Sequence, residues 1–208
     1  MTSLYTDRPF HTRYAVQQHG ARYTPELLRT HRTAKASWLY IHRQHGIDDF
    51  GPTPDWSRRT DLVATGRCAP RRADDPSLDG IKLWIEADRH AARYRPDEPV
   101  CAHSVASLPL HEGVTGWRNL IEGFCEDHLT VQGMVVDWSI HHQPDGTGDR
   151  EILPHVHMLI TMRVFDAAHV DVGRIRQTWI RTERARKALA EKWWAHSGLF
   201  PPSYALAA

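Results

Sequence analysis

The chain has 208 residues, 41% of them hydrophobic, which is typical of one globular domain spanning residues 1–208. Its formal net charge of +1 does not identify nucleic acid as a partner, although cations can still gather on one surface. No apolar run approaches the roughly 20 residues of a membrane-spanning helix. The three cysteines lack C-x-x-C spacing, which argues against a disulfide framework. We therefore expect a cytoplasmic protein without a membrane segment.

The first predicted helix covers residues 25–45, "PELLRTHRTAKASWLYIHRQH". Thr24 before Pro25 is a typical helix start and Gly46 a typical stop, with a break expected near Thr33. The next segment, 48–80, is rich in proline, glycine and charge, and it predicts a loop-rich stretch with at most a short strand at "DLVATG".

Three more elements follow in chain order. "DGIKLWIEADRHAARY" places its apolar residues at helical spacing, and "VCAHSVASLP" alternates as a strand does. A second amphipathic helix is predicted over about 112–129.

Two further strands carry polar residues on one face. In "GMVVDWSIHH", Asp137, Ser139 and His141 share the face opposite the apolar residues, because strand side chains alternate. In "PHVHMLITMR", His155 and His157 take one face in the same way. The turn residues of "PDGTGD" between the two segments predict an antiparallel hairpin.

The histidines of this hairpin are a candidate metal site. His155 and His157 point to the same side about 7 Å apart at the backbone, and His141 joins them if the two strands pair. Three imidazoles leave coordination positions open, as a catalytic metal requires. In a chain with 15 histidines the alternative is a chance H-x-H pair without a ligand role.

The last predicted helix covers about 172–196 and is rich in arginine and lysine. Such a helix can contact the DNA backbone, with tryptophans nearby for base stacking, or it can have a solvated basic face and a buried tryptophan face. The DNA-binding candidates on it are Arg174, Arg181, Arg184 and Lys187.

Taken in order, these segments resemble the HUH-type mobilisation relaxases of the MobA/MobL group, nickases that start conjugative transfer of plasmids. The likeness runs from about Thr33 to Trp194 and lies in "TAKASWLYIHR", "LWIEADRHAARY", "GMVVDWSIHH" and "PHVHMLITMR". It implies an α+β fold, for which we expect a central antiparallel sheet of about five strands that carries the histidines on one face and helices on the other. It also assigns one divalent ion, with Mg²⁺ or Mn²⁺ first and Zn²⁺, Ni²⁺ or Co²⁺ as alternatives, to His141, His155 and His157.

The chemistry implied by the resemblance is transesterification. A tyrosine attacks a phosphodiester of single-stranded DNA at the plasmid transfer origin and leaves a 5′-phosphotyrosyl bond, while the metal acts as a Lewis acid on the phosphate. Tyr40 in "YIHR" is the candidate nucleophile, although an ungapped match on "TAKA" places Trp38 there; Tyr23 is the second choice. The alternative for Tyr40 is an aromatic packing residue.

Three further residues are candidates for supporting roles at the site. Arg163, just past the histidine strand, is a candidate phosphate ligand or else a surface charge. Asp137 is expected to orient a ligand imidazole, or to form with His155 and His157 the two-histidine, one-carboxylate site of non-haem iron oxygenases. His103 stands where relatives commonly carry a glutamate that tunes the site, and an imidazole cannot replace its negative charge.

The sequence therefore predicts a metal-dependent enzyme that nicks and rejoins plasmid DNA, with accessory mobilisation proteins as further partners. A DNA-binding remnant that has lost cleavage is the main alternative, and an oxygenase-type enzyme is another.

Overall fold

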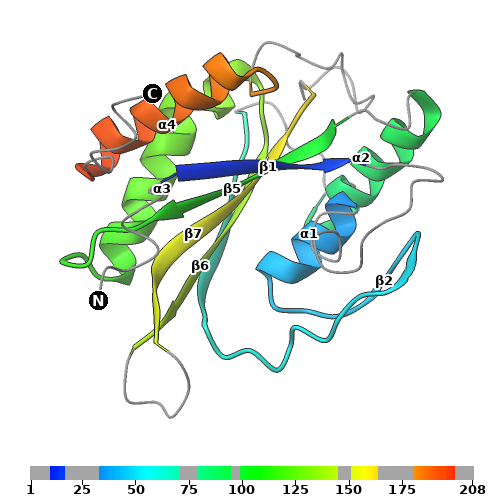
Figure 1. Ribbon diagram of the computed structural model, residues 1–208, viewed down its shortest axis with the longest axis horizontal. Coiled ribbons are helices and arrows are strands. Elements are labelled where there is room, and N and C mark those ends of the chain that lie inside the picture. Colours follow the sequence, from blue (N-terminus) through cyan, green and yellow to red (C-terminus); the bar gives the residue numbers. More distant parts are fainter. Residues whose placement is uncertain are drawn as a thin grey trace.

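The computed structural model describes residues 10–16, 33–70, 79–94, 99–144, 151–163 and 180–199. Its centre is a five-stranded antiparallel sheet in the order β1-β5-β7-β6-β4, which confirms the predicted sheet (Figure 1). The strands are β1 Phe10–Val16, β4 Leu62–Cys68, β5 Pro99–Ser107, β6 Val136–Gln143 and β7 Ile152–Thr161. A small ribbon pairs β2 Ile47–Asp48 with β3 Gly51–Pro52, and a 3-10 helix covers Thr130–Gln132.

Helices cover the sheet on both sides (Figure 1). The helices are α1 Ala34–Ile41, α2 Ile81–Tyr94, α3 Val114–His128 and α4 Glu183–Ser197. As predicted, α3 and α4 pack on the face opposite the histidines, where Phe124 and Trp193 join Trp138 of β6 and Met158 of β7 in one apolar cluster.

The histidine face also carries helices, which the sequence did not predict. This face is polar along only part of its length, because Val135 and Leu159 present apolar surface next to the histidines. Helix α1 packs there through Ala34 and Ile41, and α2 through Trp84. The chain therefore brings the "YIHR" segment to the side of the sheet that holds the histidines.

The central hairpin is antiparallel, as predicted. Strands β6 and β7 pair with His141 directly opposite His155 and Ser139 opposite His157. Because the two strands lie in the middle of the sheet, β5 flanks β7 on its other side and places Val105 opposite His157. The histidines thus lie on adjoining strands that are each paired on both sides.

Several element boundaries differ from the expected ones. Helix α1 begins after Thr33, whose side chain caps the amide of Ala36 at 2.8 Å, and it ends at Ile41 rather than at 45, because Arg43 takes a left-handed conformation (φ 52°). Residues 25–32 of that predicted helix lie outside the described residues.

The described part of segment 48–80 contains the short strand expected at "DLVATG", together with a small ribbon that was not expected. It contains β4, which pairs with β6 as an edge strand of the sheet, and most of the small β2–β3 ribbon. The C-terminal helix begins at Glu183 after the capping Thr182, whereas 172–179 lie outside the described residues. Strand β1 was not predicted, because its sequence lacks a clear alternation.

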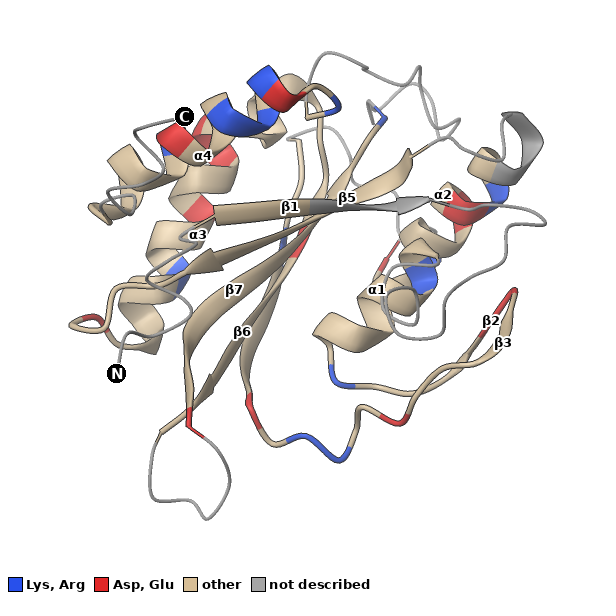
Figure 2. Ribbon diagram, viewed as in Figure 1, with Lys and Arg blue, Asp and Glu red and all other residues tan. Residues whose placement is uncertain are grey.

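Cationic side chains gather in two places among the described residues (Figure 2). One is α4, where Arg184 and Lys187 are exposed. The other is the segment between β3 and β4, where Arg58 and Arg59 are exposed. Within these described ranges, no helix has the length and apolar character needed to cross a bilayer.

Candidate metal and nucleophile site

Three histidines converge on the inner part of the hairpin. His141, His155 and His157 each offer a nitrogen atom, and these atoms all lie within 4.8 Å of one another. The three residues are 0%, 4% and 5% exposed, so the cluster is shielded from bulk water. These three imidazoles could therefore hold a metal ion.

Two of the three imidazoles are set up as metal ligands. Nδ1 of His155 lies 2.8 Å from the carbonyl oxygen of Leu153 and therefore carries the proton, which leaves Nε2 as the basic nitrogen. Nε2 of His157 is buried and has no hydrogen-bond partner in the described parts of the chain. A buried polar atom without a partner is costly, and a cation would satisfy it.

His103 orients His157. Its Nε2 lies 2.9 Å from Nδ1 of His157, so a proton on Nδ1 of His157 can be donated to it. This arrangement leaves the lone pair of His157 Nε2 available for a cation. The structure thus places the imidazole of His103 beside a candidate ligand, and its role in tuning the site stays a prediction.

Burial keeps the cluster neutral. Desolvation lowers the pKa of His155 and, more strongly, that of His157, while burial together with the charge of Arg43 lowers the pKa of His141 to about 3. Neutral imidazole is the form that binds a metal. The residues present therefore fit one divalent ion, which would be held by these three side chains.

His141 has a second set of partners. Its Nδ1 lies 2.8 Å from Nη2 of Arg43, and its Nε2 lies 2.7 Å from the carbonyl oxygen of Ile41. Arg43 also makes two bonds to Asp61, of 2.7 Å and 2.6 Å, in a buried ion pair. Burial opposes ionisation of Asp61, but the hydrogen bonds and the charge of Arg43 outweigh it and lower the pKa of that carboxyl.

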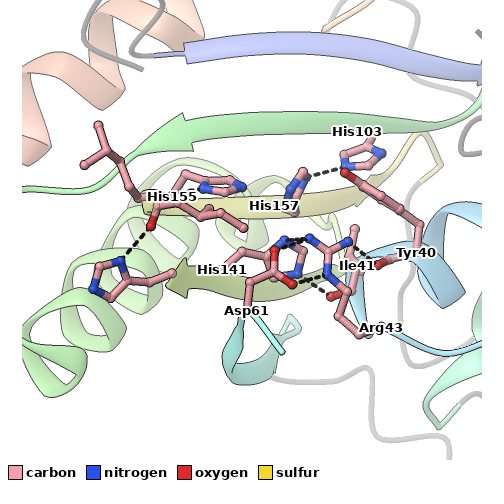
Figure 3. Close-up of polar contacts among 11 residues, drawn as sticks. Tyr40, Ile41, Arg43, Asp61, His103, His141, His155 and His157 are labelled. Atoms are coloured by element: carbon pink, nitrogen blue, oxygen red, sulfur yellow. Dashed lines mark hydrogen bonds and ion pairs between the residues drawn. The ribbon is translucent and has the colours of Figure 1, made fainter. Parts of the chain in front are cut away.

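Tyr40 is the tyrosine that faces the histidines among the described residues. Its half-buried ring lies 5.4 Å from the ring of His157 at 87°, and it extends from α1 toward His103 (Figure 3). The guanidinium carbon of Arg43 lies 4.8 Å from the centre of the Tyr40 ring, and that of Arg59 lies 6.0 Å away.

Trp38, the alternative in the ungapped match, points elsewhere. Its Nε1 donates to Asp137 at 2.9 Å, and its ring stacks on His42 with the centroids 3.9 Å apart. The helix therefore turns Tyr40, and not the residue at 38, toward the metal ligands.

Asp137 does not support the histidines, contrary to the sequence-based expectation. Its carboxylate accepts hydrogen bonds from Arg67, Trp38 and Trp84, which tie β4, α1 and α2 to the sheet. In the described residues the candidate metal group contains three histidines and no carboxylate. This arrangement argues against the two-histidine, one-carboxylate alternative.

The chain also matches a known protein family over the part that contains the histidine site. A model of the MobA/MobL family matches residues 32–197, a range that includes α1 and the whole histidine hairpin. The chain belongs to the MobA/MobL family.

Similar proteins include two curated relatives. The conjugal transfer protein TraA of Rhizobium radiobacter is 29% identical over 91 residues, which are 43% of this chain and 8% of that protein. A probable conjugal transfer protein TraA of Sinorhizobium fredii (strain NBRC 101917 / NGR234) is 33% identical over 75 residues, 35% of this chain and 6% of that protein. The MobA/MobL chain thus matches a small part of these much longer relatives.

A solved structure shares the fold. The structure described as "Molecular Basis of Vancomycin Resistance Transfer in Staphylococcus aureus" superposes with a TM-score of 0.62 at 18% identity. The superposition covers 90% of this chain and 89% of that chain. This MobA/MobL protein and that structure therefore have the same fold.

Arg163 is not brought to the histidines of the MobA/MobL site. It follows the end of β7, where it lines a small cavity with Ala87 and Ala91 of α2. It lies six positions after His157, which corresponds to roughly 20 Å along an extended strand. A contact between Arg163 and DNA remains a prediction, but the phosphate would not be the one held at the histidines.

The predicted DNA-binding residues of α4 lie on the other side of the sheet. Arg184 and Lys187 are exposed and Arg181 is half-buried, while Arg174 lies outside the described residues. Because α4 packs against α3 and β1, these cations are separated from Tyr40 by the sheet. Their role as DNA contacts stays a prediction.

Sequence reasoning missed the residues that surround Tyr40. Arg43 was visible in "YIHR", three positions after the tyrosine, but a helix predicted to continue to 45 gave no reason to place it against His141. Asp61, Trp56 and Arg59 lie in the segment expected to be mostly loop. Trp56 packs edge-on against Tyr40 at 5.4 Å, a long-range contact that no local pattern reveals.

Proposed function

We propose that this MobA/MobL protein acts in plasmid mobilisation by nicking and rejoining single-stranded DNA at a transfer origin. The observation that carries the proposal is the position of Tyr40. Its ring lies edge-on to that of His157, which is one of the three buried, convergent imidazoles. A nucleophile beside an open metal site is what phosphodiester transesterification requires. The conjugal transfer proteins that the chain resembles support the biological context.

The proposed reaction follows from the groups at the site. The Tyr40 hydroxyl attacks phosphorus, and a bond forms between the phenolic oxygen and the 5′-phosphate. The bond to O3′ breaks, and O3′ takes a proton from solvent to become a free 3′-OH. Since Tyr40 is half-buried, its proton can pass to solvent. A divalent ion at His141, His155 and His157 supplies Lewis-acid polarisation of the phosphate oxygens when bound.

Cations beside Tyr40 suit a phosphate substrate. Arg59 is exposed and its guanidinium lies 6.0 Å from the Tyr40 ring, where it can contact a DNA phosphate next to the attacked one. Trp56 fixes the ring of Tyr40 from the other side. The cations of α4 would act as a second contact, farther along the strand.

A covalent adduct is the direct test. A single-stranded origin oligonucleotide labelled at its 3′ end is incubated with the protein and Mg²⁺ or Mn²⁺, and the mixture is resolved on a denaturing gel. We expect a labelled protein band that is lost with EDTA and in Tyr40→Phe but retained in Tyr23→Phe. Cleavage by Tyr40→Phe at the wild-type level would refute the assignment.

A second candidate function is DNA binding without cleavage. It is favoured by His103 at the position of a carboxylate and by the engagement of both nitrogens of His141. Such a protein would retard the oligonucleotide in a native gel and leave it uncut under every metal condition.

A further inference from the structure

His141 is bonded in a way that conflicts with its role as a ligand. A guanidinium only donates hydrogen bonds, so Nδ1 of His141 must be the acceptor of the 2.8 Å bond from Arg43. Nε2 must then carry the proton and donate it to the carbonyl oxygen of Ile41 at 2.7 Å. Each imidazole nitrogen has one in-plane position for a proton, a hydrogen bond or a metal, and both positions of His141 are taken.

We propose that Arg43 competes with the divalent ion for His141, so that His155 and His157 take up the ion first and His141 joins them only when its bond to Arg43 is broken. The inference rests on the proposed function, because it concerns the ion of that site. It assigns to Arg43 a positioning role that controls the affinity of the site.

Both ways in which His141 can coordinate require this exchange. Coordination through Nδ1 replaces the hydrogen bond from Arg43 directly. Coordination through Nε2 moves the proton to Nδ1, where an N–H would face the N–H of the guanidinium. In either case the interaction between Arg43 and His141 is lost.

The rest of the Arg43 network would stay in place. The side chain is fixed by two bonds to Asp61 and by a third to the carbonyl oxygen of Tyr40, at 3.1 Å. Breaking one charge-assisted bond to His141 therefore weakens the affinity for the ion by about 10- to 100-fold. It does not require the buried ion pair to open.

The released N–H group lies beside the nucleophile. The guanidinium carbon is 4.8 Å from the centre of the Tyr40 ring, so a phosphate that approaches Tyr40 can accept the hydrogen bond that His141 gives up. Ion and phosphate would then strengthen one another's binding, and the coupling must be equal in both directions.

Metal titration without DNA tests the competition. Mn²⁺ binding is measured by calorimetry for the wild type and for the double variant Arg43→Met/Asp61→Asn. The first change removes the hydrogen-bond donor to His141, and the second removes the carboxylate charge of Asp61, which would otherwise be left without its partner. We expect the double variant to bind Mn²⁺ about tenfold more tightly or better. The matched control is Asp61→Asn alone, which keeps the Arg43 donor. A second control, Arg59→Met, measures the effect of removing one positive charge near the site without changing the partners of His141. Unchanged or weaker binding by the double variant overturns the proposal.

A measurement on the wild type distinguishes this inference from the proposed function. Long-range ¹H–¹⁵N correlation spectra of the metal-free protein should show His141 protonated at Nε2 and unprotonated at Nδ1. The opposite tautomer would overturn the competition even if DNA cleavage is observed. Conversely, the expected tautomer without any cleavage would sustain the role of Arg43 while the nicking activity fails.

Discussion

Tyr40 and His157 meet edge to face, with their ring centroids 5.4 Å apart and their planes at 87°. One residue comes from the short helix α1 and the other from the central strand β7, so the contact joins the proposed nucleophile to the candidate metal group. The same ring packs against Trp56 on another side, which fixes the direction of the phenol.

The Tyr40 ring and its hydroxyl have separable roles. Tyr40→Phe keeps the contacts with His157 and Trp56, so we expect the free energy of unfolding to change by no more than about 0.5 kcal/mol. Tyr40→Ala removes a half-buried ring and should cost about 1–3 kcal/mol. Urea denaturation of both variants measures the difference, and a large loss in Tyr40→Phe would show that the hydroxyl has a structural role.

The affinity for metal should depend weakly on pH. Three independent imidazoles with an ordinary pKa of about 6.5 would lose about 50-fold in affinity between pH 7.5 and pH 6.0, because each must be neutral to bind. Burial lowers the pKa of all three ligands here, that of His141 to about 3, so they stay neutral as the pH falls through this range. We expect a loss of less than about fivefold by calorimetric Mn²⁺ titration. A loss near 50-fold would mean that the rings titrate as exposed histidines do.

Asp137 should matter for stability and not for metal. Asp137→Asn removes the negative charge that pairs with Arg67, and it leaves one acceptor oxygen fewer for the N–H groups of Trp38 and Trp84. We expect the free energy of unfolding to fall by about 2–4 kcal/mol. The same change at the exposed Asp127 is the matched control and should cost no more than about 0.5 kcal/mol. The folded Asp137→Asn protein should bind Mn²⁺ with wild-type affinity; a marked loss would restore Asp137 as a supporting residue of the site.

Cations on the two sides of the sheet should contribute unequally to cleavage. Arg59→Ala removes a charge beside Tyr40 and should lower the slope of log affinity against log salt by about 0.7, the value for one phosphate contact on single-stranded DNA. It should also reduce the adduct yield. Arg184→Ala/Lys187→Ala changes the opposite side of the molecule and should leave the adduct yield on a short oligonucleotide nearly unchanged. The reverse order, measured by fluorescence anisotropy and adduct gels, would place the reacting DNA on the α4 side.

The histidine hairpin could be predicted from the sequence because its signal is local. Strand side chains alternate with a period of two, so the positions of His155 and His157 fix their common face, and a turn-rich connection brings His141 opposite His155. Leu159 on the same face was also visible in the alternation. Its consequence, a docking surface for α1 and α2, was not.

What the sequence could not predict depends on contacts between distant segments. The bond between Arg43 and His141 joins residues 98 positions apart, and it requires α1 to end at Ile41 and the backbone to turn left-handed two residues later. Asp137 was expected to be a partner of the histidines because it shares their face. Its carboxylate instead accepts hydrogen bonds from Trp38 of α1 and Trp84 of α2. The order of the strands, with β4 and β1 as the edges, likewise follows from long-range pairing.

Peptide mapping of the DNA adduct tests the central claim most directly. Trypsin cleaves after Lys35 and Arg43, so Tyr40 lies in the peptide "ASWLYIHR", which contains no other tyrosine, whereas Tyr14, Tyr23 and Tyr94 fall in separate peptides. Mass spectrometry of the nuclease-trimmed adduct should find the residual nucleotide on this peptide, and only when a divalent ion was present during the reaction. A nucleotide on any other peptide, or an adduct formed equally well in EDTA, would contradict the account.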